Sequence, residues 1–197
     1  MEEGQMFLME TGVVIGLVVA AVVVLLVIGV IAWVISTRNK FIRMEQDVEN
    51  SESRIDVYLT KRFDLLTKML DTTKGYAKHE KETLSQVIEM RNPGVNASLK
   101  EKAEFNEQMS QVAKQLSFVV ERYPDLKADR MFNNLQQSIS EVEENLQAAR
   151  SNFNSNVASF NKAILQFPGS LVAGSRFTKK EYFEAEEAKK QDVKMEF

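Results

Sequence analysis

The chain has 197 residues, enough for one domain of ordinary size and a membrane anchor. It contains no cysteine, which excludes disulfides, thiolate chemistry and cysteine-based metal sites. All 25 Lys and Arg residues follow residue 37 and 28 − 3 = 25 acidic residues do too, so the part after residue 37 is formally neutral. A neutral domain lacks the basic footprint of a nucleic-acid-binding protein, and no nucleic-acid partner is predicted.

A stretch without charge covers residues 11–37 and consists almost entirely of Val, Ile, Leu, Ala and Gly. About 20 such residues span the ~30 Å hydrocarbon core of a bilayer, so we predict one transmembrane helix after a short extracytoplasmic N-terminus, residues 1–10. A cleaved signal peptide is the alternative, and it would need a basic leader and a shorter apolar stretch. Glu2, Glu3 and Glu10 make this leader acidic instead.

Basic residues follow this stretch directly and none precedes it. Arg38, Lys40 and Arg43 should stay on the cytoplasmic side, which places the N-terminus outside and the rest of the chain inside. Trp33 then lies where an interfacial aromatic is expected at the inner boundary.

Small residues share one face of the predicted transmembrane helix. Gly12 and Gly16 form a Gly-x-x-x-Gly pattern, and Ala20 follows four residues later. This face would allow close helix–helix packing and hence a homo-oligomer, although such patterns also arise by chance in apolar segments.

Residues 38–75 show one apolar stripe at helical spacing, interrupted by no Pro or Gly before Gly75. The spacing predicts a helix about 57 Å long that continues the transmembrane helix, and Gly75 marks either a turn or a kink. The stripe consists of Phe41, Met44, Val48, Ile55, Leu59, Leu66 and Leu70.

Two further helices are predicted downstream. The first covers residues 77–91 and stops at Asn92-Pro93-Gly94. The second begins at Ser98, where Glu101 completes a capping-box pattern, with Asn96 as an alternative cap. It runs to about Arg122 before Tyr123-Pro124-Asp125 breaks it.

The clearest pattern is a heptad ladder typical of coiled-coil packing. It predicts a fourth helix that ends at Phe167-Pro168-Gly169, with the ladder in the core. Four helices with short breaks predict an all-α fold, an antiparallel up-and-down four-helix bundle over residues 38–168. Residues 169–197 are predicted to be a tail, tethered at most by Phe177, Tyr182 and Phe183. The ladder consists of Phe132, Ile139, Leu146, Phe153, Phe160 and Phe167.

The metal-binding motifs that this sequence partly matches are incomplete. His79-Glu80 begins a zinc-protease pattern, but residue 83 is Thr, so the second histidine is missing. A di-iron bundle needs Glu-x-x-His pairs, and residue 76 is Tyr. No catalytic, cofactor-binding or metal-ligating residue is predicted, and no enzymatic activity.

Four polar residues within the predicted helices are candidates for structural contacts. Arg62 and Asp64 are flanked by apolar residues, which favours partial burial and ion pairing with another helix. Asn154 and Asn161 are seven residues apart beside the phenylalanine ladder, which favours interhelical hydrogen bonds.

Several motifs together resemble the LemA family over residues 10–197. The first half carries KRFDLL at residues 61–66, KGYAKHE at 74–80 and LSQV at 84–87. The second half carries ARSNFN at 149–154, FN at 160–161, FPGSL at 167–171 and YFE at 182–184. Residues 93–99 match least.

The resemblance implies a protein of the bacterial inner membrane with a cytoplasmic four-helix bundle and no established enzymatic activity. It also implies that the polar residues of these motifs are fold-determining rather than catalytic. These are Arg62, Asp64, Glu80, Arg150, Asn154 and Asn161.

The leading functional hypothesis is therefore a membrane-anchored scaffold or adaptor. Its partners would be the lipid bilayer and proteins that the sequence does not identify, held about 55 Å from the membrane. The alternative is an enzyme or small-ligand binder with a polar interior pocket around Arg62, Asp64, Glu80 and Arg150.

Overall fold

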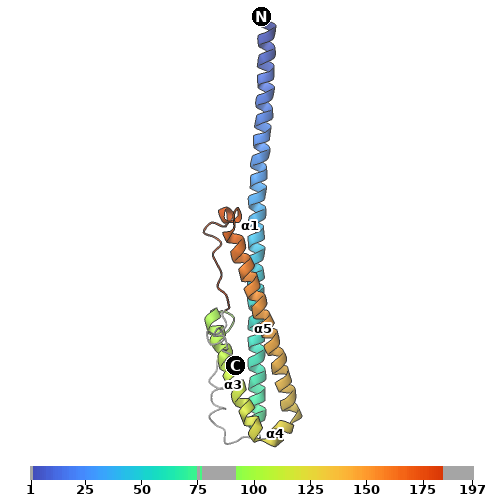
Figure 1. Ribbon diagram of the computed structural model, residues 1–197, viewed down its shortest axis with the longest axis vertical. Coiled ribbons are helices and arrows are strands. Elements are labelled where there is room, and N and C mark those ends of the chain that lie inside the picture. The colour runs from blue at the N-terminus through green and yellow to red at the C-terminus, as the bar shows by residue number, and fades with distance from the viewer. Residues whose placement is uncertain (1, 75, 77–91, 184–197) are drawn as a thin grey trace, which may run out of the picture. The chain divides into compact units, whose positions relative to one another are not determined.

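The structure, a computed structural model, describes residues 2–74, 76 and 92–183, with side chains from Ile15 onward. The described residues form helices and no strand, which confirms the all-α prediction (Figure 1). Gly75 and the helix predicted over residues 77–91 lie outside the described residues. The helices are α1 (Glu2–Lys74), α3 (Leu99–Arg122), α4 (Pro124–Ala128), α5 (Arg130–Leu165) and α6 (Gly169–Ala173).

Helix α1 is continuous over 73 residues, as the uninterrupted pattern predicted. Its most apolar 18-residue window has a mean hydropathy of 3.3, and none of that window is buried inside the protein. Leu17 and Leu25, for example, are 67% and 68% exposed. Within the described part of the chain no protein core covers these side chains, so burial there does not account for their hydropathy. By length and composition, α1 is able to cross a membrane.

The ends of the next helices follow from local hydrogen bonds. Ser98 Oγ accepts from the backbone N–H of Glu101 at 3.2 Å, and Glu101 Oε2 accepts from the backbone N–H of Ser98 at 2.8 Å, so the predicted capping box is confirmed. Helix α3 ends at Arg122, also as predicted. Pro124 then starts the short helix α4, because proline suits the first turn, where its missing N–H is not needed.

The chain divides into two compact units. The larger comprises Glu45–Phe160 and Lys180–Phe197, and the smaller comprises Met1–Met44 and Asn161–Lys179. Within the larger unit, apolar stripes of three helices form the core, as their spacing predicted. Its buried members include Val48, Ile55, Leu59, Leu66 and Leu70 from α1, Phe105, Met109, Val112 and Leu116 from α3, and Phe132, Leu146, Phe153, Val157 and Phe160 from α5.

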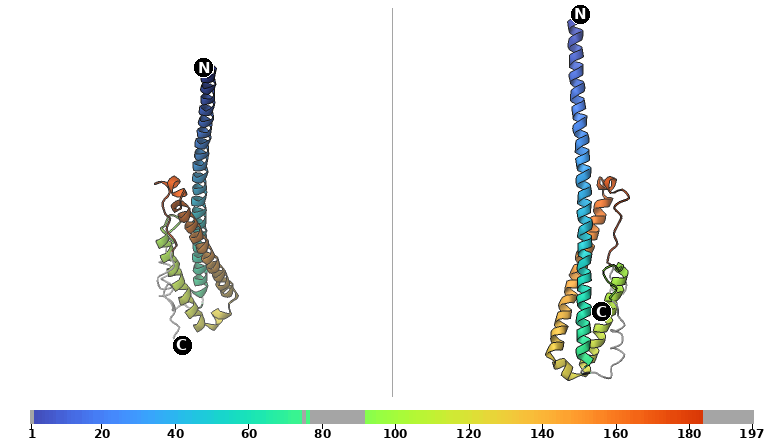
Figure 2. Two further views of the ribbon diagram at one scale, coloured as in Figure 1. Left: turned by 45° about the horizontal axis from the view of Figure 1, so that its top comes forward. Right: turned by 180° about the vertical axis from the view of Figure 1, so that it is seen from behind.

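Polar contacts define the relative directions of the helices in the larger unit. Asn156 Nδ2 donates to the backbone oxygen of Asp47 at 3.2 Å, whereas Glu143 pairs with Arg62. Later residues of α1 therefore meet earlier residues of α5, so the two helices run in opposite directions, and Figure 2 shows them side by side.

The phenylalanine ladder is core as far as Phe160, but its last member is not. Phe153 and Phe160 are 1% and 0% exposed, whereas Phe167 is 79% exposed, so the prediction that Phe167 lies in the core is wrong. Helix α5 ends at Leu165, two residues before Phe167. The residue before a proline is disfavoured in helical conformation, so Phe167 leaves the helix and its phase is lost.

The smaller unit is held together by a contact between α1 and the segment after α5. The rings of Phe41 and Phe177 meet edge to face, with centroids 5.3 Å apart and planes at 71°. Both side chains are buried. Phe177 therefore docks the segment, as the prediction of a tethered tail required.

Gly169 lies so close to its neighbours that a larger residue should destabilise the smaller unit. A Cβ at this position would lie 2.6 Å from the backbone oxygen of Ala163 and 3.2 Å from Phe41 Cζ. We expect Gly169→Ala to cost about 1–3 kcal/mol, because a backbone atom must move. Ser170→Ala, at an exposed position of the same helix, is the control. Urea unfolding of the full chain in mild detergent measures both, and equal stabilities would contradict the prediction.

Candidate functional site

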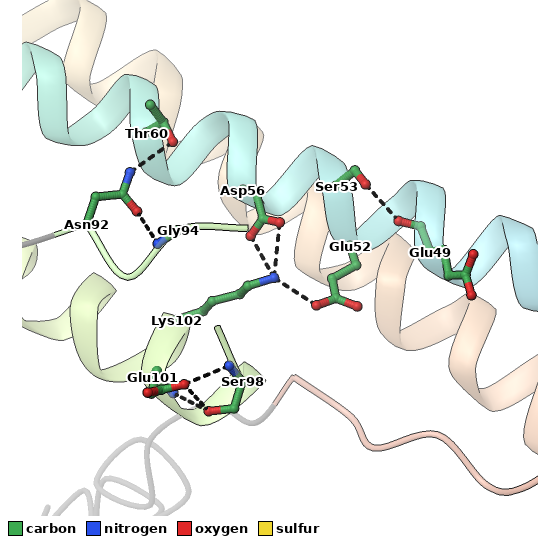
Figure 3. Close-up of polar contacts among 10 residues, drawn as sticks. All are labelled: Glu49, Glu52, Ser53, Asp56, Thr60, Asn92, Gly94, Ser98, Glu101 and Lys102. Carbon is green, nitrogen blue, oxygen red and sulfur yellow. Dashed lines mark hydrogen bonds and ion pairs between the residues drawn. The ribbon is translucent and has the colours of Figure 1, made fainter. Parts of the chain in front are cut away.

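The most deeply buried charge among the described residues is Lys102, in the first turns of α3. Its side chain is 1% exposed, and Nζ lies 2.8 Å from Glu52 Oε1 and 2.8 Å from Asp56 Oδ1, both on α1 (Figure 3). The carboxylates are separated by one helical turn, so they lie on the same face of α1. One ammonium group therefore cross-links α3 to two positions of α1.

The charges of this cluster shift each other's protonation. Burial lowers the pKa of Lys102, but hydrogen bonds to Asp56 and Glu52 outweigh burial and raise the pKa above its ordinary value of 10.5. Burial raises the pKa of Asp56 above 3.8, and Lys102 offsets this only in part. An amine must lose its proton to act as a nucleophile. The raised pKa keeps Lys102 protonated, so its position suits a structural cation.

The loop before α3 is bonded to α1 at Thr60, one helical turn after Asp56. Asn92 Nδ2 donates to Thr60 Oγ1 at 3.1 Å, and Asn92 Oδ1 accepts from the backbone N–H of Gly94 at 3.0 Å (Figure 3). Gly94 has φ 82°, a conformation that favours glycine. An open groove beside the loop is lined by Ser53, Asp56, Val57, Thr60, Lys61, Asp64 and Val95.

A second buried cation, Arg62, connects three helices. Its Nη1 donates to Asn106 Oδ1 at 2.6 Å and to Ser110 Oγ at 3.3 Å on α3, and its Nη2 pairs with Glu143 on α5. The Arg62 side chain is 4% exposed, whereas the Glu143 side chain is 44% exposed. The planar fork of arginine suits this role, because it donates in several fixed directions at once. Arg62 thus has the structural ion pair that its apolar flanks predicted.

The segment after α6 is docked on α5 through Phe183. Asn154 Oδ1 accepts from the backbone N–H of Phe183 at 2.8 Å, and Asn154 Nδ2 donates to its backbone oxygen at 3.1 Å. The guanidinium of Arg150 lies 4.7 Å from the centroid of the Phe183 ring. Asn154 therefore bonds to an extended segment, and the predicted interhelical hydrogen bond is wrong for this residue. Tyr182, which was expected to tether the tail, is 46% exposed.

The remaining predicted site residues are dispersed. Asp64 is exposed and lines the groove, so its predicted partial burial is wrong: a helix turns 100° per residue, which places Asp64 about 200° from Arg62. Asn161 is buried, and Glu80 lies outside the described residues. Arg62, Asp64 and Arg150 contact different parts of the larger unit and do not converge on one pocket.

The predicted small face and interfacial aromatic lie on α1. Gly16 has open space around its Cα, with nothing within 4 Å of an added Cβ. Ala20 is exposed and Trp33 is 39% exposed. Gly12 lies on α1 as well, among the residues whose side chains are not described.

Sequence reasoning missed the Lys102 cluster. Two signals were available. The capping box at Ser98 and Glu101 places Lys102 in the first turn of α3, and Glu52 and Asp56 form an i, i+4 pair of carboxylates on α1. Lysines are almost never buried unless paired, so Lys102 by itself predicts a solvent-exposed position. Only the packing of α3 on α1 reveals the site.

Another polar contact that sequence reasoning missed caps α5. Asp129 Oδ1 accepts from the backbone N–H groups of Met131 and Phe132 at 2.7 and 3.0 Å, and Asp129 Oδ2 accepts from Tyr76 Oη at 2.8 Å. The bonds from Phe132, Tyr76 and Met131 lower the pKa of Asp129 below 3.8. The same contact raises the pKa of Tyr76.

This cap should make stability depend on acid pH. Because the folded-state pKa of Asp129 is depressed, its contribution is present above pH 3.8 and is lost as pH falls through the folded pKa. Tyr76→Phe removes one of the bonds that lower this pKa, so we expect acid unfolding of the full chain to begin at higher pH. Circular dichroism during acid titration in detergent measures it. Superimposable curves for wild type and Tyr76→Phe would contradict the assignment.

Comparisons with a family model and with individual known proteins indicate the same family. A sequence model of the LemA family matches residues 51–197, which include the Lys102, Arg62 and Asn154 contacts. Protein LemA of Metamycoplasma hominis is 31% identical, with 76% of this chain and 69% of the relative covered. Magnetosome protein MamQ 2 of Paramagnetospirillum magneticum is 23% identical over 84% of this chain and 71% of the relative. MamQ of Magnetospirillum gryphiswaldense is 22% identical over 83% and 70%.

The family match and the relative above 30% identity both cover most of the chain. They agree with the resemblance carried by the motifs at residues 61–66, 149–154 and 167–171. The LemA family match, the MamQ relatives and the apolar, unburied part of α1 together indicate a membrane-associated helical protein. The chain belongs to the LemA family.

Proposed function

We propose that the chain is a single-pass scaffold or adaptor that presents a helical bundle to protein partners on the cytoplasmic face of the bacterial inner membrane. The observation that carries the proposal is α1, because one continuous helix contains both the apolar stretch and the core residues of the larger unit. The apolar stretch and the bundle are thus joined by helix and not by a flexible linker.

The proposed bundle is an antiparallel up-and-down four-helix bundle. Within the described residues, α5 runs opposite to α1, and α3 runs in the same direction as α1, since Lys102 meets Glu52 and Ser110 meets Arg62. A returning helix between α1 and α3 would complete this arrangement; the sequence predicts it over residues 77–91, which lie outside the described residues.

Membrane orientation is proposed from charge. Arg38, Lys40 and Arg43 follow the apolar stretch, so a reporter that works only in the cytoplasm should be active when fused after Phe197 and inactive before Glu2. Exchanging the charges, with Lys at Glu2, Glu3 and Glu10 and neutral residues at the three basic positions, should scramble this pattern. An active external reporter after Phe197 of the unaltered chain would refute the orientation.

A non-enzymatic role is supported by the local chemistry. Arg62 and Lys102 form ion pairs within the fold, and the groove lined by Asp56 and Asp64 is open. A ligand-binding site of the alternative kind is expected to be concave and to bury most of its ligand. Three of the four charges of the alternative pocket are described, and they are dispersed.

Purification of the tagged full chain from membranes in mild detergent tests the scaffold. We expect specific proteins to co-purify with wild type and with Asp64→Asn, which alters only an exposed groove residue, and to be lost with Phe160→Ala, which removes a core side chain. Turnover or tight binding of a small molecule that Asp64→Asn abolishes would favour the enzymatic or ligand-binding alternative instead.

A further inference from the structure

Three apolar side chains at the corner between α5 and α6 are exposed to solvent. Leu165, Phe167 and Leu171 are 56%, 79% and 72% exposed. Single exposed apolar residues are ordinary on protein surfaces, but three within seven residues of one corner indicate a contact surface. We call residues 165–171 the apolar corner.

The apolar corner is fixed at the end of the apolar stretch of α1. Gly169 lies against Phe41, since an added Cβ would be 3.2 Å from Phe41 Cζ, and Phe177 packs on the same ring. Figures 1 and 2 show α6 beside α1. Phe41 comes four residues after Thr37, the last residue of the charge-free stretch, which is about 6 Å along a helix. The corner therefore lies at the level where a bilayer that surrounds residues 11–37 would end.

The segments around the corner are strongly basic. Residues 38–44 and 161–179 are the part of the smaller unit that follows the charge-free stretch. They contain six cations and no Asp or Glu. Anionic lipids attract such basic residues when they lie next to a membrane helix. The six are Arg38, Lys40, Arg43, Lys162, Arg176 and Lys179.

We propose that the apolar corner is a second membrane contact, in which Phe167 and Leu171 insert into the interface of a bilayer that contains anionic lipids. Amphipathic surface segments bury apolar side chains about 5–10 Å into this boundary, with basic residues beside the headgroups. A protein partner or second copy would not require the corner to lie level with the end of the apolar stretch. The proposal rests on the proposed membrane anchor and adds a lipid-binding site outside it.

The test uses tryptophan as a depth reporter in the full chain. The sequence has one tryptophan, so Trp33→Phe provides a background without indole emission. Phe167→Trp then reports on the corner. Phe118→Trp is the matched control, since Phe118 is an equally exposed phenylalanine, 72%, on α3 in the larger unit. Both variants are reconstituted in vesicles of phosphatidylcholine, with and without an equal share of phosphatidylglycerol, and quenched by lipids spin-labelled near the headgroup.

We expect the reporter at position 167 to be blue-shifted and strongly quenched in the anionic vesicles, and less so in neutral vesicles or at high salt. The control at position 118 should stay red-shifted and unquenched. Equal, water-like emission at both positions would overturn the proposal. Equal quenching at position 167 in neutral and anionic vesicles would overturn it as well. A blue shift without lipid quenching that disappears on dilution of the protein would identify a second copy as the occupant, which also overturns it.

Vesicle flotation separates this result from failure of the anchor. If the chain does not float with vesicles, the proposed anchor fails. If it floats but position 167 reports water, only the second contact fails. Both substituted phenylalanines are exposed, so neither variant removes a core side chain.

Discussion

Phe160→Ala should destabilise the full chain by about 3–5 kcal/mol, because truncating a buried phenylalanine removes its transfer free energy and leaves a cavity. Phe160 is 0% exposed and belongs to the buried stripe of α5, together with Val157 and Ile164. Such a loss is a large share of the ~5–15 kcal/mol that stabilises a typical domain. Phe153→Ala, at 1% exposure, should behave in the same way.

The same substitution at exposed phenylalanines provides the control. Phe118 and Phe167 are 72% and 79% exposed, so Phe118→Ala and Phe167→Ala should change the free energy of unfolding by only about 0.5 kcal/mol or less. Urea unfolding of the full chain in mild detergent, followed by circular dichroism, compares the four variants. If Phe167→Ala proved as damaging as Phe160→Ala, the end of α5 and the exposure of the corner would be wrong.

The second large effect is expected at Lys102. Lys102→Met keeps an unbranched stem but removes the charge, which leaves Glu52 and Asp56 close together with no cation between them. Their side chains are 34% and 14% exposed, so water solvates them only in part. Breaking a buried ion pair by removing one partner costs about 3–5 kcal/mol. We expect a loss of about 3 kcal/mol, because the Glu52 side chain is partly exposed to water.

Removing all three charges distinguishes this cost from a loss of packing. The triple variant Lys102→Met, Glu52→Gln, Asp56→Asn should recover most of the lost stability, because no charge is then stranded. Lys100→Met on the same helix is the control: Lys100 is 87% exposed, and its pairing with Glu104 at 3.8 Å contributes little. A triple variant no more stable than Lys102→Met would show that the lysine stem, rather than its charge, matters.

The single variant should also respond to pH in a defined direction. Burial already raises the pKa of Asp56, and loss of Lys102 removes the hydrogen bond and the positive charge that lower this pKa. A folded-state pKa above the unfolded value means that protonation favours folding, so the deficit of Lys102→Met should shrink as pH falls through the raised pKa. In wild type, the raised pKa of Lys102 has its own effect: that stabilisation is present below pH 10.5 and is lost as pH rises through the folded value.

Local patterns in the sequence were sufficient for the long helices α1, α3 and α5, but the short helices α4 and α6 were not predicted. The capping box at Ser98 and Glu101 was readable because its partners are three residues apart. The buried stripes on α1 and α5 were predictable, because an apolar helix face must be buried whichever element covers it. The charge-free stretch was readable because bilayer thickness sets a length that a soluble helix does not need. The LemA family motifs were likewise present in the chain itself.

Tertiary structure alone decided which polar residues meet. Lys102 is buried only because α3 places it opposite Glu52 and Asp56, about fifty residues earlier. Asn154 bonds to Phe183 because a segment after α6 passes over it. A periodic pattern states which face of a helix is covered but not which residues of another helix lie opposite. The energy of a charge depends on those partners, so the apolar core was determined locally, whereas the ion pairs required the packed chain.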